Sequence, residues 1–184
     1  DIGTDIDDAI ALYLCTQNKN LDLRGVYVTS DNVDLRGKVA KKLLNLTQCN
    51  AEVGIGEADS LTQKTIPYSM GFETTYLTKE EHKKTLQGWG IKEKGIEAML
   101  ERIQEIDILL SIAPMTNLAK VLEEKQDLRK RVYVMGGRRD CMEYNFSHDV
   151  LATQQVFASD LDILVVPADV CTDKIDATKI CALR

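Results

Sequence analysis

The alternation of apolar runs with amphipathic stretches is the feature of this sequence that most limits its fold. Short β-branched and aliphatic runs predict strands at 25–30, 51–55, 106–112, 132–135 and 163–166. Periodic patterns between them predict helices at 33–46, 79–86, 95–104, 116–124 and 149–159, and Thr116 is expected to cap the fourth of them. Continuously apolar strands joined by helices indicate buried, parallel pairing. We therefore expect an α/β fold: an open, mostly parallel, Rossmann-like sheet with helices on both faces.

Two stretches carry more specific expectations. In the helix at 33–46, the apolar positions include Val39 and Leu43, and the basic positions include Arg36 and Lys38. This pattern predicts that Arg36 and Lys38 lie on an exposed face. Residues 57–90 are polar, and we expect them to form an exposed excursion from the fold.

Composition narrows the class of protein. The 184 residues suit a single domain, 1–184, which we expect to be incomplete at both ends. A net charge of −6 argues against a nucleic-acid partner, and no apolar run is long enough for a membrane span. Five scattered cysteines without a CxxC pair indicate reduced thiols and a cytoplasmic protein.

Four aspartates lie in the first eight residues: Asp1, Asp5, Asp7 and Asp8. Carboxylates at this density repel one another unless a cation or a proton neutralises them. Oxygen ligands favour Ca²⁺ or Mg²⁺ over zinc or copper. The loop therefore predicts a metal site, and Asp8 is expected as the N-cap of the first helix.

Two other interpretations of these acids are weaker. Helix capping alone uses only one or two carboxylates, so it does not explain the whole cluster. An EF-hand requires glycine at the sixth position of its loop and glutamate at the twelfth, where this chain has Ile6 and Leu12.

Segments that are candidates for a ligand site follow several of the predicted strands. They lie at 29–32, at 113–117, at 135–137 and at Asp169, and a strand is expected to end at or before Asp1. Parallel α/β sheets bind ligands beyond the carboxyl ends of their strands. These segments are therefore expected to converge on one site.

The chain resembles the inosine-uridine type nucleoside hydrolases in several blocks that follow the family order. They are residues 1–12 (DIGTDIDDAIAL), 30–32 (SDN), 112–119 (IAPMTNLA), 135–137 (MGG) with 143–145 (EYN) and Asp149, and 163–170 (ILVVPADV). The first block is similar to the family signature Asp-x-Asp-x-Gly-x-Asp-Asp-Ala-x-Ala-Leu, with Asp5 and Ile6 as two extra loop residues. The resemblance implies a nucleoside hydrolase fold.

The resemblance also implies an activity: Ca²⁺-dependent hydrolysis of the N-glycosidic bond of ribonucleosides, in a homodimer or homotetramer. It implies that Asp7 is the base that activates a water molecule bound to calcium, although the insertion leaves Asp5 as the alternative. The remaining implied site residues are the metal ligands Asp1, Asp8 and Thr116 (through its carbonyl) and the ribose contacts Asn32, Glu143 and Asn145.

The sequence departs from the family pattern at one important point. The later part of family members carries a His-Asp pair, and this chain stops at Arg184 before any such block. Its histidines are His82, in the polar excursion, and His148, near the predicted site. A structural role and a substrate contact are both open for His148.

Two alternative functions follow. One is a catalytically inactive homologue that binds a nucleoside or a sugar, as the missing His-Asp pair suggests. The other is a phosphatase-like hydrolase with an aspartate nucleophile and Mg²⁺. The phosphatase hypothesis rests only on acids after a presumed strand and leaves Asn32, Thr116 and Asn145 without a role.

Overall fold

The computed structural model describes residues 1–62 and 75–171. The strands are β1 Gly25–Val28, β2 Glu52–Ile55, β3 Ile108–Ser111, β4 Arg131–Met135 and β5 Asp162–Val166. The helices are α1 Asp7–Gln17, α2 Val33–Leu46, α3 Lys79–Lys83, α4 Leu86–Trp89, α5 Gly95–Arg102, α6 Thr116–Glu124, α7 Tyr144–His148, α8 Val150–Phe157 and α9 Ala168–Cys171. Part of the predicted excursion (63–74) and Cys181 lie outside the described residues.

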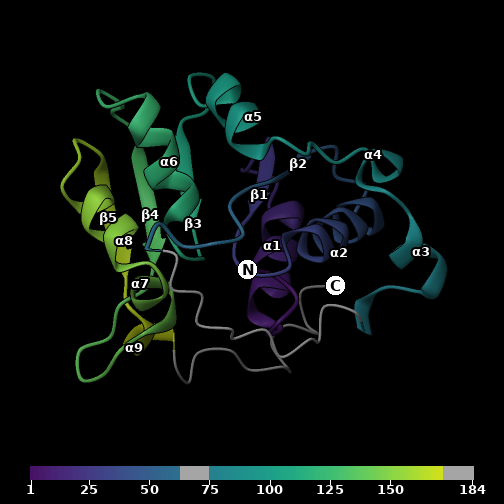
Figure 1. Ribbon diagram of the computed structural model, residues 1–184, viewed down its shortest axis with the longest axis horizontal. Helices are drawn as coiled ribbons and strands as arrows, with labels where there is room; N and C mark the ends of the chain where they lie inside the picture. The colour runs from purple at the N-terminus through teal and green to yellow at the C-terminus, as the bar shows by residue number, and fades with distance from the viewer. Residues whose placement is uncertain (63–74, 172–184) are drawn as a thin grey trace.

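All strand pairs in the described residues are parallel, as the apolar runs predict. β1 pairs with β2, with Gly25 opposite Glu52. β4 lies between β3 and β5, with Leu110 opposite Tyr133 and Tyr133 opposite Leu164. Within residues 1–62 and 75–171 these strands form two hydrogen-bonded sheets rather than one. The sheets lie side by side in Figure 1.

Helices cover both faces of the sheet formed by β1 and β2. Successive residues of a strand point to opposite faces. A Cβ on Gly54 would lie 2.9 Å from the Cα of Gly95 in α5, whereas the side chain of Ile55 reaches Gly37 in α2. α5 and α2 therefore pack on opposite faces of β2, as the α/β prediction requires.

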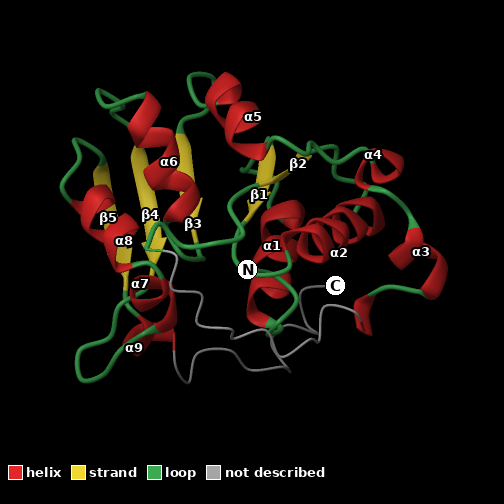
Figure 2. Cartoon of the chain, viewed as in Figure 1, coloured by secondary structure: helices red, strands yellow, loops and turns green. Residues whose placement is uncertain are grey.

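The second sheet has a different environment on each of its faces. Val132 and Val134 are fully buried in a core formed with α5, α6 and α8, and α6 and α8 lie in front of this sheet in Figure 2. On the opposite face, Ile108, Leu110 and Leu164 are 49%, 55% and 48% exposed. The prediction that β3 and β5 are fully buried is therefore wrong, because no described residues cover this face.

Two further predictions about exposure need correction. Arg36 is 1% exposed and Lys38 is 9% exposed, so neither lies on a solvent face of α2. Trp89, in the predicted excursion, is also buried and packs in the core around α2. None of the helices in residues 1–62 and 75–171 is long and apolar enough to cross a membrane.

Candidate functional site at the carboxyl ends of the strands

The acidic loop folds back so that its first and last aspartates are close. The amino nitrogen of Asp1 lies 4.0 Å from Oδ2 of Asp8, and both side chains are 13% exposed. Asp5 and Asp7 are exposed. α1 begins at Asp7, and its N-cap is Ile6 without a side-chain hydrogen bond, so the prediction of Asp8 as N-cap is wrong. Asp8 is thereby free of a capping role.

The environment of Asp8 suits a cation. Burial raises the pKa of its carboxyl, and the charges of Asp7 and Asp5 raise it further, against the opposing effect of Arg36. A nearby cation would offset the repulsion among the Asp5, Asp7 and Asp8 carboxylates. The oxygen donors of Asp1 and Asp8 fit Ca²⁺ or Mg²⁺ in chemistry. They are two carboxylates only: nowhere in the described part of the chain do three His, Cys, Asp or Glu side chains form a metal-binding group.

Arg36 joins the acidic loop to the loop that follows β1. Its guanidinium donates to the backbone carbonyls of Asp1 and Ile2 and, through Nε, to that of Ser30 at 2.9 Å. It also pairs with Asp31 at 3.4 Å. The sequence analysis missed this role. A signal was present, because position 36 lies three and four residues before Val39 and Ala40, on the apolar stripe of α2.

The loop after β1 has an unusual backbone. Ser30 and Asp31 have φ values of 71° and 51°, a left-handed conformation that non-glycine residues adopt at a cost. Hydrogen bonds from their amides to the carbonyls of Glu57 and Ala58, both 2.9 Å, hold them in place. The next residue, Asn32, is exposed and caps α2 by accepting a hydrogen bond from Leu35 N at 3.4 Å.

Thr116 begins α6, as predicted, but its hydroxyl does not cap the helix. The hydroxyl donates instead to Oδ2 of Asp149 at 2.8 Å. Asp149 is fully buried and also accepts hydrogen bonds from Leu61 N and from Ala152 N, the latter as N-cap of α8. The carboxylate of Asp149 therefore fixes Thr116 beside the start of α8.

Glu143 and Asn145 lie at the carboxyl ends of β3 and β4. The Glu143 carboxylate accepts hydrogen bonds from the amides of Gly137, Asn145 and Phe146, at 2.8, 2.8 and 3.2 Å. Nδ2 of Asn145 donates to the carbonyls of Ile112 and Met135 at 3.2 and 3.1 Å. Asn145 thus joins the carboxyl ends of β3 and β4, and the segment around it forms α7, which the sequence did not predict.

Asn117 connects the two sheets. Its Nδ2 donates to Val28 O at the end of β1, at 3.1 Å. Its Oδ1 accepts from Glu57 N, just beyond β2, at 2.9 Å. A Cβ on Gly56 would lie 2.2 Å from this oxygen, so glycine is required there for the approach.

His148 closes α7 and is buried, at 4% exposure. Within residues 1–62 and 75–171, neither of its ring nitrogens has a hydrogen-bond partner. Burial lowers the pKa of the imidazole, against the opposing effect of the Asp31 and Asp149 carboxylates. The ring is therefore neutral near pH 7 and retains one donor and one acceptor.

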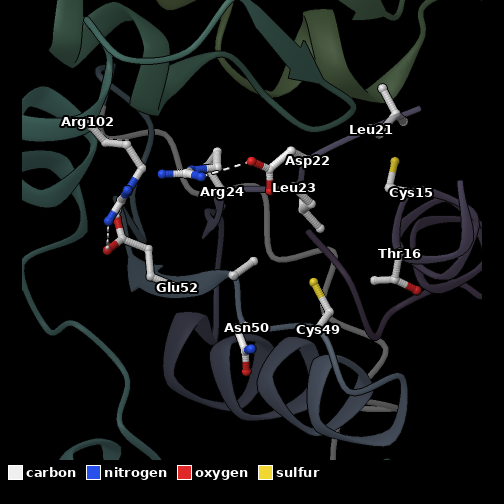
Figure 3. A pocket seen from close by; sticks show the side chains of 11 residues that line it. Cys15, Thr16, Leu21, Asp22, Leu23, Arg24, Cys49, Asn50, Glu52 and Arg102 are labelled. Carbon is white, nitrogen blue, oxygen red and sulfur yellow. Dashed lines mark hydrogen bonds and ion pairs between the residues drawn. The ribbon is translucent and has the colours of Figure 1, made fainter. Parts of the chain in front are cut away.

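A cavity of about 410 Å³ lies at the opposite, amino ends of β1 and β2. Figure 3 shows that its charged side chains pair with one another, Arg24 with Asp22 at 2.8 Å and Arg102 with Glu52 at 2.9 Å. The hydrogen bond from Arg102 lowers the pKa of Glu52. These four charged side chains are therefore partnered within the protein.

Comparison with known proteins places the chain in a family. Residues 1–183 match the model of the "Inosine-uridine preferring nucleoside hydrolase" family. Proteins called non-specific ribonucleoside hydrolase RihC are similar to the chain: 26% identical over 190 residues in Escherichia fergusonii and 27% over 191 residues in Escherichia coli O139:H28. Each alignment covers 95% of this chain, which spans 62% of the length of these relatives.

A solved structure described as inosine-guanosine nucleoside hydrolase has a similar fold. It aligns with a TM-score of 0.75 and 18% identity, covering 91% of this chain and 60% of the other. The α/β architecture expected from the sequence is confirmed by this match.

Proposed function

Because the chain belongs to the inosine-uridine preferring nucleoside hydrolase family, we propose that it takes part in Ca²⁺-dependent hydrolysis of the N-glycosidic bond of ribonucleosides. The products would be a free base and ribose, as purine or pyrimidine salvage requires. The observation that carries the proposal is that Asp1 and Asp8 are both partly buried and that Asp8 Oδ2 lies 4.0 Å from the backbone nitrogen of Asp1. This is at the carboxyl ends of the strands, where α/β folds bind ligands.

In this proposal Asp1, Asp8 and the carbonyl of Thr116 would hold a calcium ion. Bound calcium would lower the pKa of water and accept sugar hydroxyls among its ligands. Arg36 keeps the Asp1 backbone in place, and the Asp149 carboxylate fixes Thr116. Both ligand-bearing segments are thus held by buried charged side chains.

The exposed Asp7 would take the proton of the attacking water. Cleavage develops oxocarbenium character on the ribose, so the sugar must be held firmly while the base leaves. Asn32, Glu143 and Asn145 would bind its hydroxyls. Both hydrogens of Asn145 Nδ2 are used within the protein, which leaves its side-chain oxygen for the sugar.

A catalytically inactive homologue that binds a nucleoside or a sugar is the second candidate. One observation favours it: the Glu143 carboxylate already accepts hydrogen bonds from three backbone amides, a structural role that needs no substrate.

We also propose a cytoplasmic homodimer or homotetramer without nucleic-acid or membrane partners. Free cysteines at 15, 49, 141 and 171 are consistent with a reducing compartment.

The test is release of reducing sugar from inosine, adenosine, uridine and cytidine by the full-length protein, with and without EDTA. We expect ribose release that EDTA abolishes. Asp7→Asn should lower kcat about a hundredfold or more, because the base is lost while the fold is kept. Asp5→Asn, at the neighbouring exposed acid, is the matched control and should retain activity.

Three outcomes separate the alternatives. Loss of activity in Asp5→Asn but not in Asp7→Asn would exchange the roles of these residues. Binding of Ca²⁺ and ribose without hydrolysis would favour the inactive homologue. Ribose release that EDTA does not affect would contradict the metal-dependent proposal.

A further inference from the structure

His148 is a buried polar side chain, at 4% exposure. Neither Nδ1 nor Nε2 makes a hydrogen bond with the residues that the structure describes. Its ring contacts that of Tyr144, with centroids 5.0 Å apart and planes inclined by 48°. Leaving a buried polar group unpaired destabilises a fold, and such groups in native proteins often serve a function.

The position of His148 connects it to the candidate site. It is the last residue of α7, three positions after Asn145, and it precedes Asp149, which holds Thr116. His148 therefore lies at the junction of α7 and α8, next in the chain to the carboxylate that holds Thr116.

The neighbouring polar side chains are largely occupied. Glu143 accepts from three amides, Asn145 uses both donors, and Asp149 accepts from two amides and the Thr116 hydroxyl. By contrast, both ring nitrogens of His148 are unpaired among the described residues. A neutral imidazole offers one donor and one acceptor, which matches a hydroxyl group.

We propose that His148 is a substrate-binding residue that hydrogen-bonds a ribose hydroxyl of the nucleoside. This inference rests on the proposed function and deepens it, because it assigns to His148 a sugar contact rather than a base contact. The bound hydroxyl satisfies the ring nitrogen that the protein leaves unpaired, so the cost of burial is recovered when the sugar binds.

Nuclear magnetic resonance on the histidine rings tests the proposal directly. The full-length protein, labelled with ¹⁵N-histidine, is titrated with ribose and then with inosine in the presence of Ca²⁺. The signals of His148, assigned with His148→Gln, are expected to shift with either ligand. The exposed His82 is the internal control and should not respond.

A substitution gives the kinetic counterpart. His148→Phe keeps a flat ring and removes both polar atoms, so the fold should be at least as resistant to heat as the original. We expect its KM for inosine to rise about tenfold or more, with a smaller change in kcat, because a ligand hydrogen bond is lost. His82→Phe should leave KM unchanged.

The outcomes distinguish this inference from the proposed function. Hydrolysis without any shift of His148 overturns the inference alone, and a shift with inosine but not with ribose overturns the sugar assignment. A ribose-dependent shift without hydrolysis supports the inference and contradicts the proposed activity. Absence of both binding and hydrolysis overturns both.

Discussion

At the scale of single residues, Arg36 shows how one charged side chain can organise a site. It is 1% exposed and connects Asp1 and Ile2 with Ser30 and Asp31. Breaking a buried ion pair leaves the other charge without compensation, which is far more costly than losing an exposed pair. The acidic loop and the strained loop after β1 therefore depend on the same guanidinium.

We predict that Arg36→Met lowers the free energy of unfolding by about 3–5 kcal/mol, because Asp31 and three carbonyls lose their donor. Urea unfolding measures this change. Arg129→Met is the matched control: it breaks an Arg–Asp pair of similar length, 3.3 Å to Asp160, whose side chains are 80% and 64% exposed. The control should cost at most about 1 kcal/mol. Equal effects would show that Arg36 does not hold the loops together.

At the scale of elements, β3 illustrates how alternation along a strand divides structural from exposed positions. Leu109 packs against the core formed with α6 and α8, whereas Leu110 is 55% exposed on the opposite face. These two leucines are consecutive residues of the same strand. They differ only in the face to which they point.

We predict that Leu109→Ala lowers the free energy of unfolding by about 2 kcal/mol or more, because it removes packed methyl groups from a core. Leu110→Ala, its matched control, should cost less than about 1 kcal/mol, because most of its side chain contacts solvent. Urea unfolding of both variants measures the difference. Equal and large losses would mean that the open face of β3 is covered in solution.

At the scale of the whole molecule, the described residues form two cores. One surrounds α1, α2, β1 and β2 and contains Trp89, and the other surrounds α6, α8 and the strands β3, β4 and β5. Asn117 joins the end of β1 and the start of the loop after β2 to α6. Helix α5 also packs against both parts. Prediction of one domain over 1–184 requires that these cores unfold together.

We predict that Asn117→Ala makes the two cores unfold at different urea concentrations. Trp89 is the single tryptophan of the chain and reports only on the first core. In the unaltered protein, its fluorescence and far-ultraviolet circular dichroism should change at the same urea concentration. In the variant, the fluorescence transition should move to lower urea, because the buried carbonyl of Val28 and the partly buried amide of Glu57 lose their partner. Asn45→Ala, at an exposed position of α2, is the control and should unfold like the unaltered protein. Fluorescence and circular dichroism transitions that coincide in Asn117→Ala would contradict the prediction.

Local pattern was sufficient for most of the fold. The bounds predicted for α2 and α6 are those observed, and the apolar runs identified each strand of the described residues and its parallel pairing. Order along the chain was also enough to bring polar residues to the carboxyl ends of the strands, because this placement follows from the βα alternation. Apolar periodicity and spacing are local properties, and a sequence displays them directly.

The tertiary structure alone decided which polar groups are buried and what they contact. The burial of Arg36, the use of Thr116 by Asp149 rather than as a cap, and the open face of β3 all depend on partners distant in sequence. The link from Asn117 to Val28 spans 89 positions. Such contacts are fixed by how the elements pack, and the same residue types at the same spacing are equally compatible with exposure.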